Sequence, residues 1–362
     1  MNPLLTPWTL AALSLRNRIV RSATWEGACD DAGQPTDKTI DYYRALAQGG
    51  VGLIISGYTF VTPEGKQQKG QAGLYNDAFA AAFHGMTEAV HAHQGKVVLQ
   101  LVHTGGQANP AQSGHPAVAP SAVETAQYAQ APQALDAPGI QRLIDAFATA
   151  AARAKQWGFD GVQLHAAHGY LINQFLSPLT NQRTDAWGGS AENRRRFLCD
   201  TVRAVRRQVG GDFALLVKLS ACDHLPGGLS ENEAVAAAVA LDALGVDAIE
   251  VSSGTAASGA LGPTRTGVHA PEAEAYNAFH AARIKAAVRC PVIAVGGFRS
   301  VEVAQRVLET GAADAVAMSR PFIREPDLAM RWRDGDLRAA TCVSCNRCFV
   351  AGFRGGIRCL KR

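Results

Sequence analysis

The amino-acid sequence predicts a (β/α)8 barrel, and three observations lead to this fold. Eight short, nearly continuous apolar runs recur along the chain, as in the strands of a parallel sheet covered by helices. The segments between them space their apolar residues three or four apart, as amphipathic helices do. No G-x-G-x-x-G occurs in the chain, which disfavours the alternative of a doubly wound open sheet with a phosphate loop after its first strand.

The eight predicted strands leave room for a helix after each. They span residues 19–23, 51–56, 96–101, 159–164, 214–219, 247–251, 291–295 and 314–318. Helical spacing is clearest at residues 140–154 and 301–308. Several helices are predicted to end at glycines just before a strand, where a left-handed cap lets the chain re-enter the sheet: Gly49 and Gly50, Gly158, Gly245 and Gly311.

The domain organisation follows from composition, which stays even through the alternating part. We expect one barrel domain over residues 1–335 and a short Cys-rich C-terminal tail, residues 336–362, packed on or near it. Residues 108–138 form a long Pro-, Ala- and Gln-rich insertion after the third strand. We expect a lid that borders the substrate pocket, the alternative being a disordered connector.

Composition and charge exclude several classes of protein. The 362 residues are 47% hydrophobic and 18% charged, enough for a large core. The net charge of +4 is mild and the basic residues are scattered, apart from residues 194–196 and 206–207, so no nucleic-acid partner is expected. No signal-peptide pattern and no apolar run of membrane-spanning length occurs, so we expect a cytoplasmic protein without a membrane partner. The oligomeric state, homo-oligomer included, stays open.

Active sites of (β/α)8 barrels lie at the carboxyl ends of the strands. The predicted strand ends are rich in hydrogen-bond donors and poor in carboxylates, which favours an anionic, polar-edged aromatic ligand over a hard metal ion. After the seventh and eighth strands stand Gly296 and Gly297, then Ser319 and Arg320. These loops often hold a phosphate in this fold, through close backbone N–H groups and a guanidinium. Simple turns are the alternative for the glycines.

The end of the fourth strand carries two imidazoles and a phenol, in His165, His168 and Tyr170. They can converge only if the chain turns back sharply, which Gly169 and Pro178 allow. The alternative is two solvated loop histidines and a packing tyrosine. A zinc site at the histidines lacks a nearby third ligand and the usual i, i+4 spacing.

Three segments carry a family resemblance. The run of residues 165–197, with residues 15–20 and 100–105, resembles the signature of the old yellow enzyme family of flavin-dependent ene reductases. The resemblance covers residues 1–335. It implies non-covalent FMN across the mouth of the barrel, with NAD(P)H as the reductant.

The resemblance also implies a role for each matching residue. Gln100 would bond the pyrimidine edge of the flavin, and Lys218 would take the place of the usual arginine beside flavin N1, where a cation stabilises the reduced ring. The phosphate would be held by Gly296, Gly297, Ser319 and Arg320, and the ring would be lined by Ser22, Ala23 and Gly57.

The implied activity is hydride transfer from NAD(P)H to an activated alkene or related acceptor, such as an enone, nitro compound or quinone. His165 and His168 would hold the activating oxygen of this small-molecule substrate, and Tyr170 would protonate the α carbon. Both substrates would use the same flavin face in turn, in a ping-pong scheme. A flavin-free, metal-dependent barrel hydrolase using the two histidines, and a non-catalytic ligand-binding barrel, stay open as alternatives.

Two features depart from the family pattern. Trp25 stands where the family commonly has a cysteine or threonine near flavin N5, and its bulk is expected to narrow the substrate pocket, unless Thr24 takes that position. The tail contains Cys342, Cys345, Cys348 and Cys359. This resembles the iron–sulfur segment of the dienoyl-CoA reductase branch, although there the third cysteine stands one residue further on. The sequence leaves iron–sulfur, zinc and free thiols open, so no metal ligand is assigned.

Overall fold

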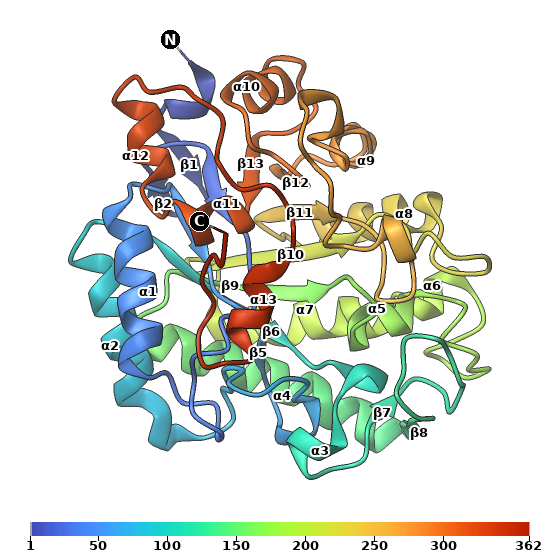
Figure 1. The fold of residues 1–362 in the computed structure, drawn as a ribbon. Helices are drawn as coiled ribbons and strands as arrows, with labels where there is room; N and C mark the ends of the chain where they lie inside the picture. Colours follow the sequence, from blue (N-terminus) through green and yellow to red (C-terminus); the bar gives the residue numbers. More distant parts are fainter. Residues whose placement is uncertain (1, 362) are drawn as a thin grey trace.

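The computed structural model describes residues 2–361 and contains a closed barrel of eight parallel strands (Figure 1). Around the ring the strands are β4 (Leu53–Ile55), β3 (Ile19–Arg21), β13 (Ala315–Met318), β12 (Val292–Val295), β11 (Ala248–Ser252), β10 (Ala214–Ser220), β9 (Gly161–Ala166) and β6 (Val97–Val102). Pairing of β4 with β6, in the register Ile54 to Val97, closes the ring. All eight predicted strands are present, so the (β/α)8 prediction is confirmed and the open-sheet alternative is wrong.

The barrel interior has an apolar layer below and a polar layer above. Alternate residues of a strand point to the same side, so the inward positions of β10 and β11 read Leu216 then Lys218, and Ala248 then Glu250. The hairpin of β1 (Trp8–Leu10) and β2 (Leu13–Leu15) packs against the apolar layer through its buried leucines. The polar layer therefore lies at the carboxyl ends of the strands.

Helices surround the barrel. The longer ones are α1 (Asp37–Gln48), α2 (Ala80–His91), α4 (Ala137–Gln156), α7 (Arg196–Val209), α8 (Glu231–Ala243), α9 (Ala278–Lys285) and α10 (Val301–Glu309). Gly50, Gly158, Gly245 and Gly311 have φ between 69° and 88°, as their cap positions predict. Short helices complete the fold: α3 (Pro110–Ser113), α5 (Leu171–Leu176), α6 (Ala191–Arg194), α11 (Arg320–Arg324), α12 (Leu328–Arg333) and α13 (Arg347–Gly352).

The insertion at residues 108–138 is folded, so it is not a disordered connector. It contains α3 and the paired short strands β7 (Val118–Ala119) and β8 (Gln133–Ala134), while β5 (Thr59–Phe60) pairs with β6 elsewhere. Its Gln127 and Tyr128 pack on Gly169 and Gly106. Within residues 2–361, none of its side chains lines the cavities described below, so it supports the loop after β9 instead of covering a pocket.

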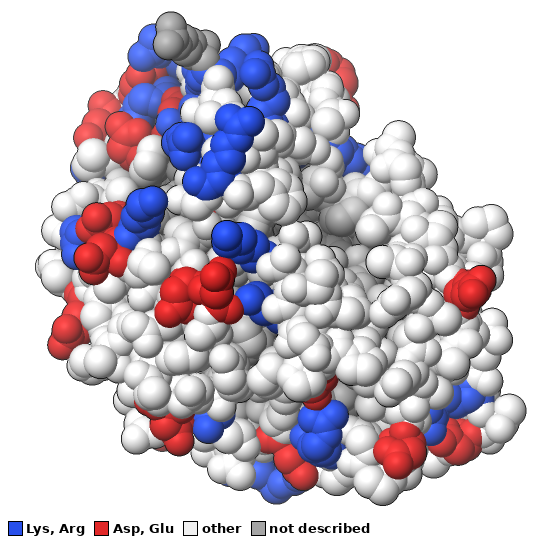
Figure 2. Space-filling model, turned by 60° about the horizontal axis from the view of Figure 1, so that its bottom comes forward, with Lys and Arg blue, Asp and Glu red and all other residues white. Residues whose placement is uncertain are grey.

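The C-terminal tail returns across the mouth of the barrel. Figure 1 shows α13, in red, in front of the strands. On the face drawn in Figure 2, charges of both signs are dispersed, and Lys and Arg gather towards its upper edge. Among the helices of residues 2–361, none combines the length and apolarity that crossing a bilayer requires.

Candidate active site

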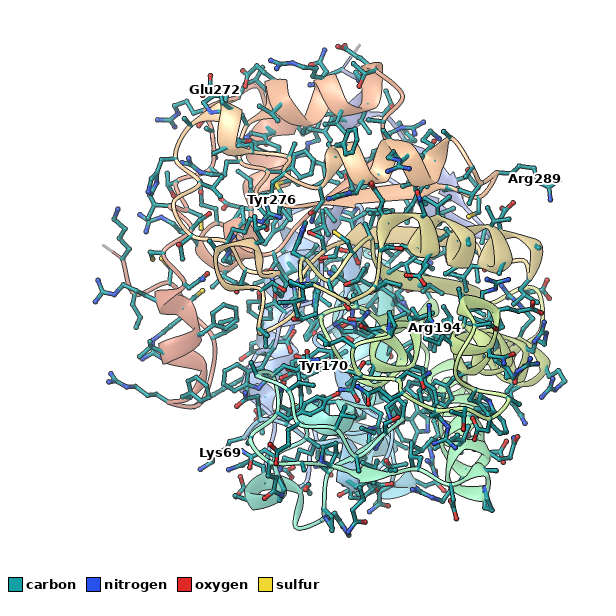
Figure 3. All side chains as sticks on the ribbon, turned by 90° about the vertical axis from the view of Figure 1, so that its right-hand side faces the viewer. Lys69, Tyr170, Arg194, Glu272, Tyr276 and Arg289 are labelled. Atoms are coloured by element: carbon teal, nitrogen blue, oxygen red, sulfur yellow. The ribbon has the colours of Figure 1, made fainter. Side chains whose placement is uncertain are left out.

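Two adjoining cavities open at the carboxyl ends of the strands. The first has a volume of about 90 Å³ and the second of about 440 Å³. Both are lined by Ala23, Thr24, His168, Lys218, Pro263, Thr264 and Phe349, so they form one continuous cleft. Tyr276 lines the first cavity and Tyr170 the second (Figure 3). The volume of the second cavity lies in the range of pockets that bind small molecules.

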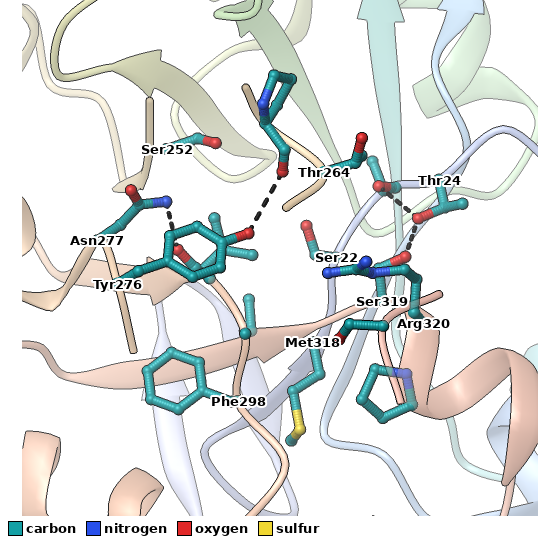
Figure 4. A pocket seen from close by; sticks show the side chains of 18 of the residues that line it. Ser22, Thr24, Ser252, Thr264, Tyr276, Asn277, Phe298, Met318, Ser319 and Arg320 are labelled. Carbon is teal, nitrogen blue, oxygen red and sulfur yellow. Dashed lines mark hydrogen bonds between the residues drawn. The ribbon is translucent and has the colours of Figure 1, made fainter. Parts of the chain in front are cut away.

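The first cavity has the features of a phosphate site (Figure 4). Gly296 and Gly297 have φ of 147° and 75°, and a Cβ on either would come within 2.9 Å of the Tyr276 ring. Glycine is therefore required there, for conformation and for space. Across the cavity, Arg320 donates Nη1–H to the Arg265 carbonyl at 2.8 Å and to Asn346 Oδ1 at 2.7 Å, which fixes its guanidinium.

Ser319 lines the same cavity and is hydrogen-bonded to Thr24. The structure thus brings Gly296, Gly297, Ser319 and Arg320 together, as expected from the sequence. Their donor chemistry, backbone N–H groups with one cation and one hydroxyl, suits a phosphate monoester.

A buried network of polar side chains forms the floor between the two cavities. Gln100 Nε2 donates to Gln163 Oε1 at 2.7 Å, and Gln163 Nε2 donates to Glu250 Oε2 at 2.9 Å. The other oxygen of Glu250 accepts from Ser22 Oγ at 2.5 Å and from Lys218 Nζ at 3.1 Å. Ser22 also receives a hydrogen bond from Lys218 at 2.9 Å. The Glu250 carboxylate therefore orients Lys218 directly and Gln100 through Gln163.

Glu250 supplies the one carboxylate of this network. It is 0% exposed and forms an ion pair with Lys218, which is 3% exposed. Lys218 lies at the cleft as expected, and the negative charge of Glu250 balances its positive charge. A buried charge without a partner would be strongly unfavourable, so each member of the pair requires the other.

The end of β9, which carries His165, and the loop after it bring His165, His168 and Tyr170 together, so the alternative of solvated loop residues is wrong. His165 packs edge-on to both partners, with ring centroids 4.9 Å from each. His168 has a positive φ of 64° and is followed by Gly169 at 77°, which is the sharp reversal that the spacing requires. Leu171 N then donates to the His103 carbonyl at 3.0 Å and holds the start of α5 against the neighbouring strand end.

Burial, and then the positive charge of nearby groups, lower the pKa of His165 and of His168 well below the usual value. Both imidazoles are therefore neutral at pH 7. His165 Nδ1 accepts from Ala167 N–H at 3.3 Å, which leaves the proton on Nε2 as a hydrogen-bond donor. His168 Nε2 and Ser252 Oγ lie 2.7 Å apart. Burial raises the pKa of Tyr170 to about 12, so its phenol keeps its proton.

Gly57 and Trp25 occupy different positions relative to the cleft. Gly57 lines neither cavity; its N–H donates to Glu26 Oε1 at 3.0 Å and to Tyr43 Oη at 2.9 Å, while its neighbour Tyr58 lines the second cavity. Trp25 lines the second cavity, donates Nε1–H to the Lys69 carbonyl at 3.2 Å and packs on Phe353 of the tail. Its indole is thus fixed as a wall of that cavity.

Several residues at the site were not identified from the sequence, among them Gln163, Glu250, Tyr276 and Phe349. Gln163 and Glu250 are polar residues in otherwise apolar strands, and that contrast was the available signal. Tyr276 and Phe349 line the cavities from a long loop and from the tail, where no local pattern indicates proximity to the barrel mouth.

The four tail cysteines gather around a small cavity beside α11. Its lining includes Cys342, Cys345, Cys348, Cys359 and Arg320, so it adjoins the proposed phosphate site. Arg324 Nη1 donates to Cys359 Sγ at 3.2 Å. Ser344 and Asn346 have φ of 52° and 58°, so the backbone turns sharply between the cysteines. Among residues 2–361, no three of these sulfurs lie within 4.8 Å of one another.

Comparison with known proteins shows the family of the chain. The sequence model of the NADH:flavin oxidoreductase / NADH oxidase family matches residues 3–337. A protein named metal reductase, from Desulforamulus reducens, is 37% identical over 98% of this chain and 52% of its own length. An NADPH dehydrogenase of Geobacillus thermodenitrificans is 37% identical over 89% of this chain and 91% of its own.

A solved structure of 2-naphthoyl-CoA reductase with 2-naphthoyl-CoA superposes with a TM-score of 0.90 and 28% identity, over 98% of this chain and 56% of that one. The chain therefore spans about half the length of the metal reductase and of the naphthoyl-CoA reductase, and nearly all of the NADPH dehydrogenase.

Proposed function

Because the chain belongs to the NADH:flavin oxidoreductase / NADH oxidase family, we propose that it is an FMN-dependent oxidoreductase that transfers hydride from NAD(P)H to an activated alkene or a related acceptor. Family membership confirms the resemblance to the old yellow enzymes. The observation that carries the proposal is the continuous cleft, with Gly296, Gly297 and Arg320 at one end and the neutral histidine pair at the other.

The residues of the cleft fit FMN. Gly296, Gly297, Ser319 and Arg320 would hold the phosphate, while Gln100 and Lys218, fixed by Glu250, would meet the polar edge of the ring. Ser22 contributes through this network, Ala23 lines both cavities, and Gly57 supports the wall from behind Tyr58. Bound FMN supplies the two-electron chemistry that none of these side chains can perform.

The side chains of the second cavity act on the acceptor. His165 Nε2–H donates a hydrogen bond to the activating oxygen, together with His168, and polarises the conjugated double bond. Tyr170, whose hydroxyl lies 3.0 Å from Gln67 Oε1, gives its proton to the α carbon. Trp25 and Phe353 narrow the space for the acceptor.

The alternative of a metal-dependent hydrolase at His165 and His168 lacks support. Across the described residues 2–361, no His, Cys, Asp or Glu supplies a third ligand atom that groups with these two imidazoles. A cytoplasmic location belongs to the proposal, since NAD(P)H is available there and none of the eight cysteines, which all lie within the described residues, forms a disulfide.

The proposal is tested by spectroscopy of the purified protein. We expect a yellow protein that binds FMN and is bleached anaerobically by NADH or NADPH, then reoxidised by an enone, nitro compound or quinone. Arg320→Ala should weaken FMN binding about tenfold or more, because it removes the phosphate cation. A colourless protein that does not take up added FMN would overturn the proposal.

We also propose that the four tail cysteines hold an iron–sulfur cluster. A tetrahedral zinc–thiolate site needs sulfurs about 3.8 Å apart, given Zn–S bonds of about 2.3 Å. Among residues 2–361, no three of the tail sulfurs lie within 4.8 Å of one another, which favours a cluster of several irons, next to Arg320. Iron and acid-labile sulfide should be present in anaerobically purified protein and lost in Cys345→Ser. Stoichiometric zinc in their place would contradict this assignment.

A further inference from the structure

A second group of metal-ligating side chains lies outside the cleft and outside the tail. Cys222 and His224 stand on the loop after β10, and His280 lies in the first turn of α9. One ligand atom from each lies within 4.8 Å of the others, and Cys222 Sγ is 3.5 Å from both ring nitrogens of His224. All three residues are half-buried, so an ion could enter from solvent.

The loop is built so that Cys222 and His224 share a side. Asp223 between them is 2% exposed; its carboxylate accepts from Leu229 N–H at 2.8 Å and from Asn173 Nδ2 at 3.3 Å. These bonds hold the Asp223 side chain on the barrel side of the loop. The side chains of Cys222 and His224 therefore face α9. His224 has a φ of 53°, a conformation that a non-glycine residue adopts rarely and only when its surroundings hold it.

His280 is oriented by a carboxylate, as metal-binding histidines commonly are. Its Nδ1 lies 2.6 Å from Oε1 of Glu231, at the start of α8, and the other oxygen of Glu231 pairs with Arg283. Helices α8 and α9 lie side by side on the barrel (Figure 1). A proton on Nδ1 leaves the Nε2 lone pair free, and Glu231 acts as an outer partner that fixes the ring.

The donor atoms of the three side chains also suit a transition metal. One thiolate with two imidazoles is a donor set for zinc, whereas magnesium and calcium prefer oxygen ligands.

We propose that Cys222, His224 and His280 form a zinc site, with water as the fourth ligand. On binding, the Cys222 S–H bond breaks, its proton leaves to solvent and the sulfur bonds the metal. The site is separate from the proposed oxidoreductase chemistry and does not depend on it.

The site would brace one wall of the cleft. Gly254 N–H donates to the Cys222 carbonyl at 2.8 Å, and Ser258 Oγ donates to the Asp223 carbonyl at 2.6 Å. Gly254 and Ser258 belong to the loop after β11, which also supplies Thr255, Ala256 and Gly259 to the second cavity. Zinc bound to Cys222 and His280 would therefore hold this loop in place relative to α8 and α9.

The test is zinc content at controlled free Zn²⁺. Purified full-length enzyme is dialysed against buffered Zn²⁺, and bound metal is counted by elemental analysis. We expect wild type and the control Cys290→Ser, a half-buried cysteine outside the group, to hold one more zinc per chain than Cys222→Ser or His280→Ala. Glu231→Gln should lower the affinity of this site for zinc by about 10–100-fold.

Two further measurements identify the zinc ligands and test whether zinc stabilises the fold. The zinc-edge X-ray absorption spectrum should show mixed sulfur and nitrogen ligands, and Zn²⁺ should raise the melting temperature of wild type but not of His224→Ala. His224→Ala also replaces Cys222→Ser if that variant fails to fold, judged by circular dichroism. Equal zinc in wild type and all variants, or a spectrum with sulfur ligands alone, would overturn the proposal.

Discussion

Tyr170 combines a raised pKa with a fixed position, and this combination predicts its role. Because burial raises the pKa to about 12, the phenol stays protonated from pH 6 to pH 10, and reoxidation by the acceptor should not change with its titration in this range. Tyr170→Phe should slow reoxidation by about 10²–10⁴-fold and leave reduction by NAD(P)H unchanged. Stopped-flow measurement of the two half-reactions checks this.

Tyr58→Phe is the matched control, since Tyr58 stacks on Tyr170 with ring centroids 5.6 Å apart and also bonds Gln67. Equal slowing of both half-reactions by Tyr170→Phe would show that the side chain shapes the cleft and is not the proton donor.

The Lys218–Glu250 pair predicts a non-additive effect on stability. Glu250→Gln leaves the buried Lys218 charge without a partner and should cost about 3–5 kcal/mol. The double variant Glu250→Gln with Lys218→Met should recover most of this, because it removes both charges. Thermal unfolding of the four proteins gives the coupling energy.

The exposed pair Arg203–Asp200 provides the comparison, and Asp200→Asn should change stability by at most about 1 kcal/mol. Additive losses from the two buried substitutions would show that Lys218 and Glu250 are solvated independently.

At the scale of elements, α13 completes the cleft from outside the barrel. Phe349 lines both cavities, and Phe353 packs on Trp25 with ring centroids 4.8 Å apart. Phe349→Ala should raise the FMN dissociation constant about tenfold, equivalent to about 1.4 kcal/mol, and admit bulkier acceptors. Fluorescence titration with FMN measures the first effect, and kcat/KM over a series of enones measures the second.

Phe279→Ala is the control for this prediction, because Phe279 is 68% exposed and lines neither cavity. Unchanged FMN affinity in Phe349→Ala would mean that α13 covers the cleft without contributing to binding.

Elements that depend on local sequence patterns could be predicted from the sequence. Contacts that form only when distant parts of the chain fold back on one another could not. The barrel strands are buried on both sides, so their apolar runs were visible, and Gly158 and Gly311 marked helix ends through their required φ. Glu250 was missed because it was taken as part of an apolar strand. Phe349 was missed because its position depends on how the tail crosses the barrel mouth, which no nearby residue encodes.

At the scale of the whole molecule, residues 2–361 form one cleft at the barrel mouth and no separate nucleotide-binding domain, which predicts the kinetic scheme. Under the proposed function, NAD(P)H and the acceptor would both use the second cavity, lined by Trp25 and His168, and would occupy it in turn. Initial rates at several fixed acceptor concentrations should give parallel lines in double-reciprocal plots. Intersecting lines would indicate that both substrates bind together and would contradict this scheme.

The ring of strands is joined where β13 pairs with β3, in the register Ala317 to Val20, so the first and the last barrel strands to leave the ribosome are neighbours. Arg320 is the second residue after that last strand, and Ser22 is the first residue after β3. During synthesis, the growing chain therefore offers no complete phosphate site until Arg320 has emerged. FMN would then be captured only after the barrel has been translated.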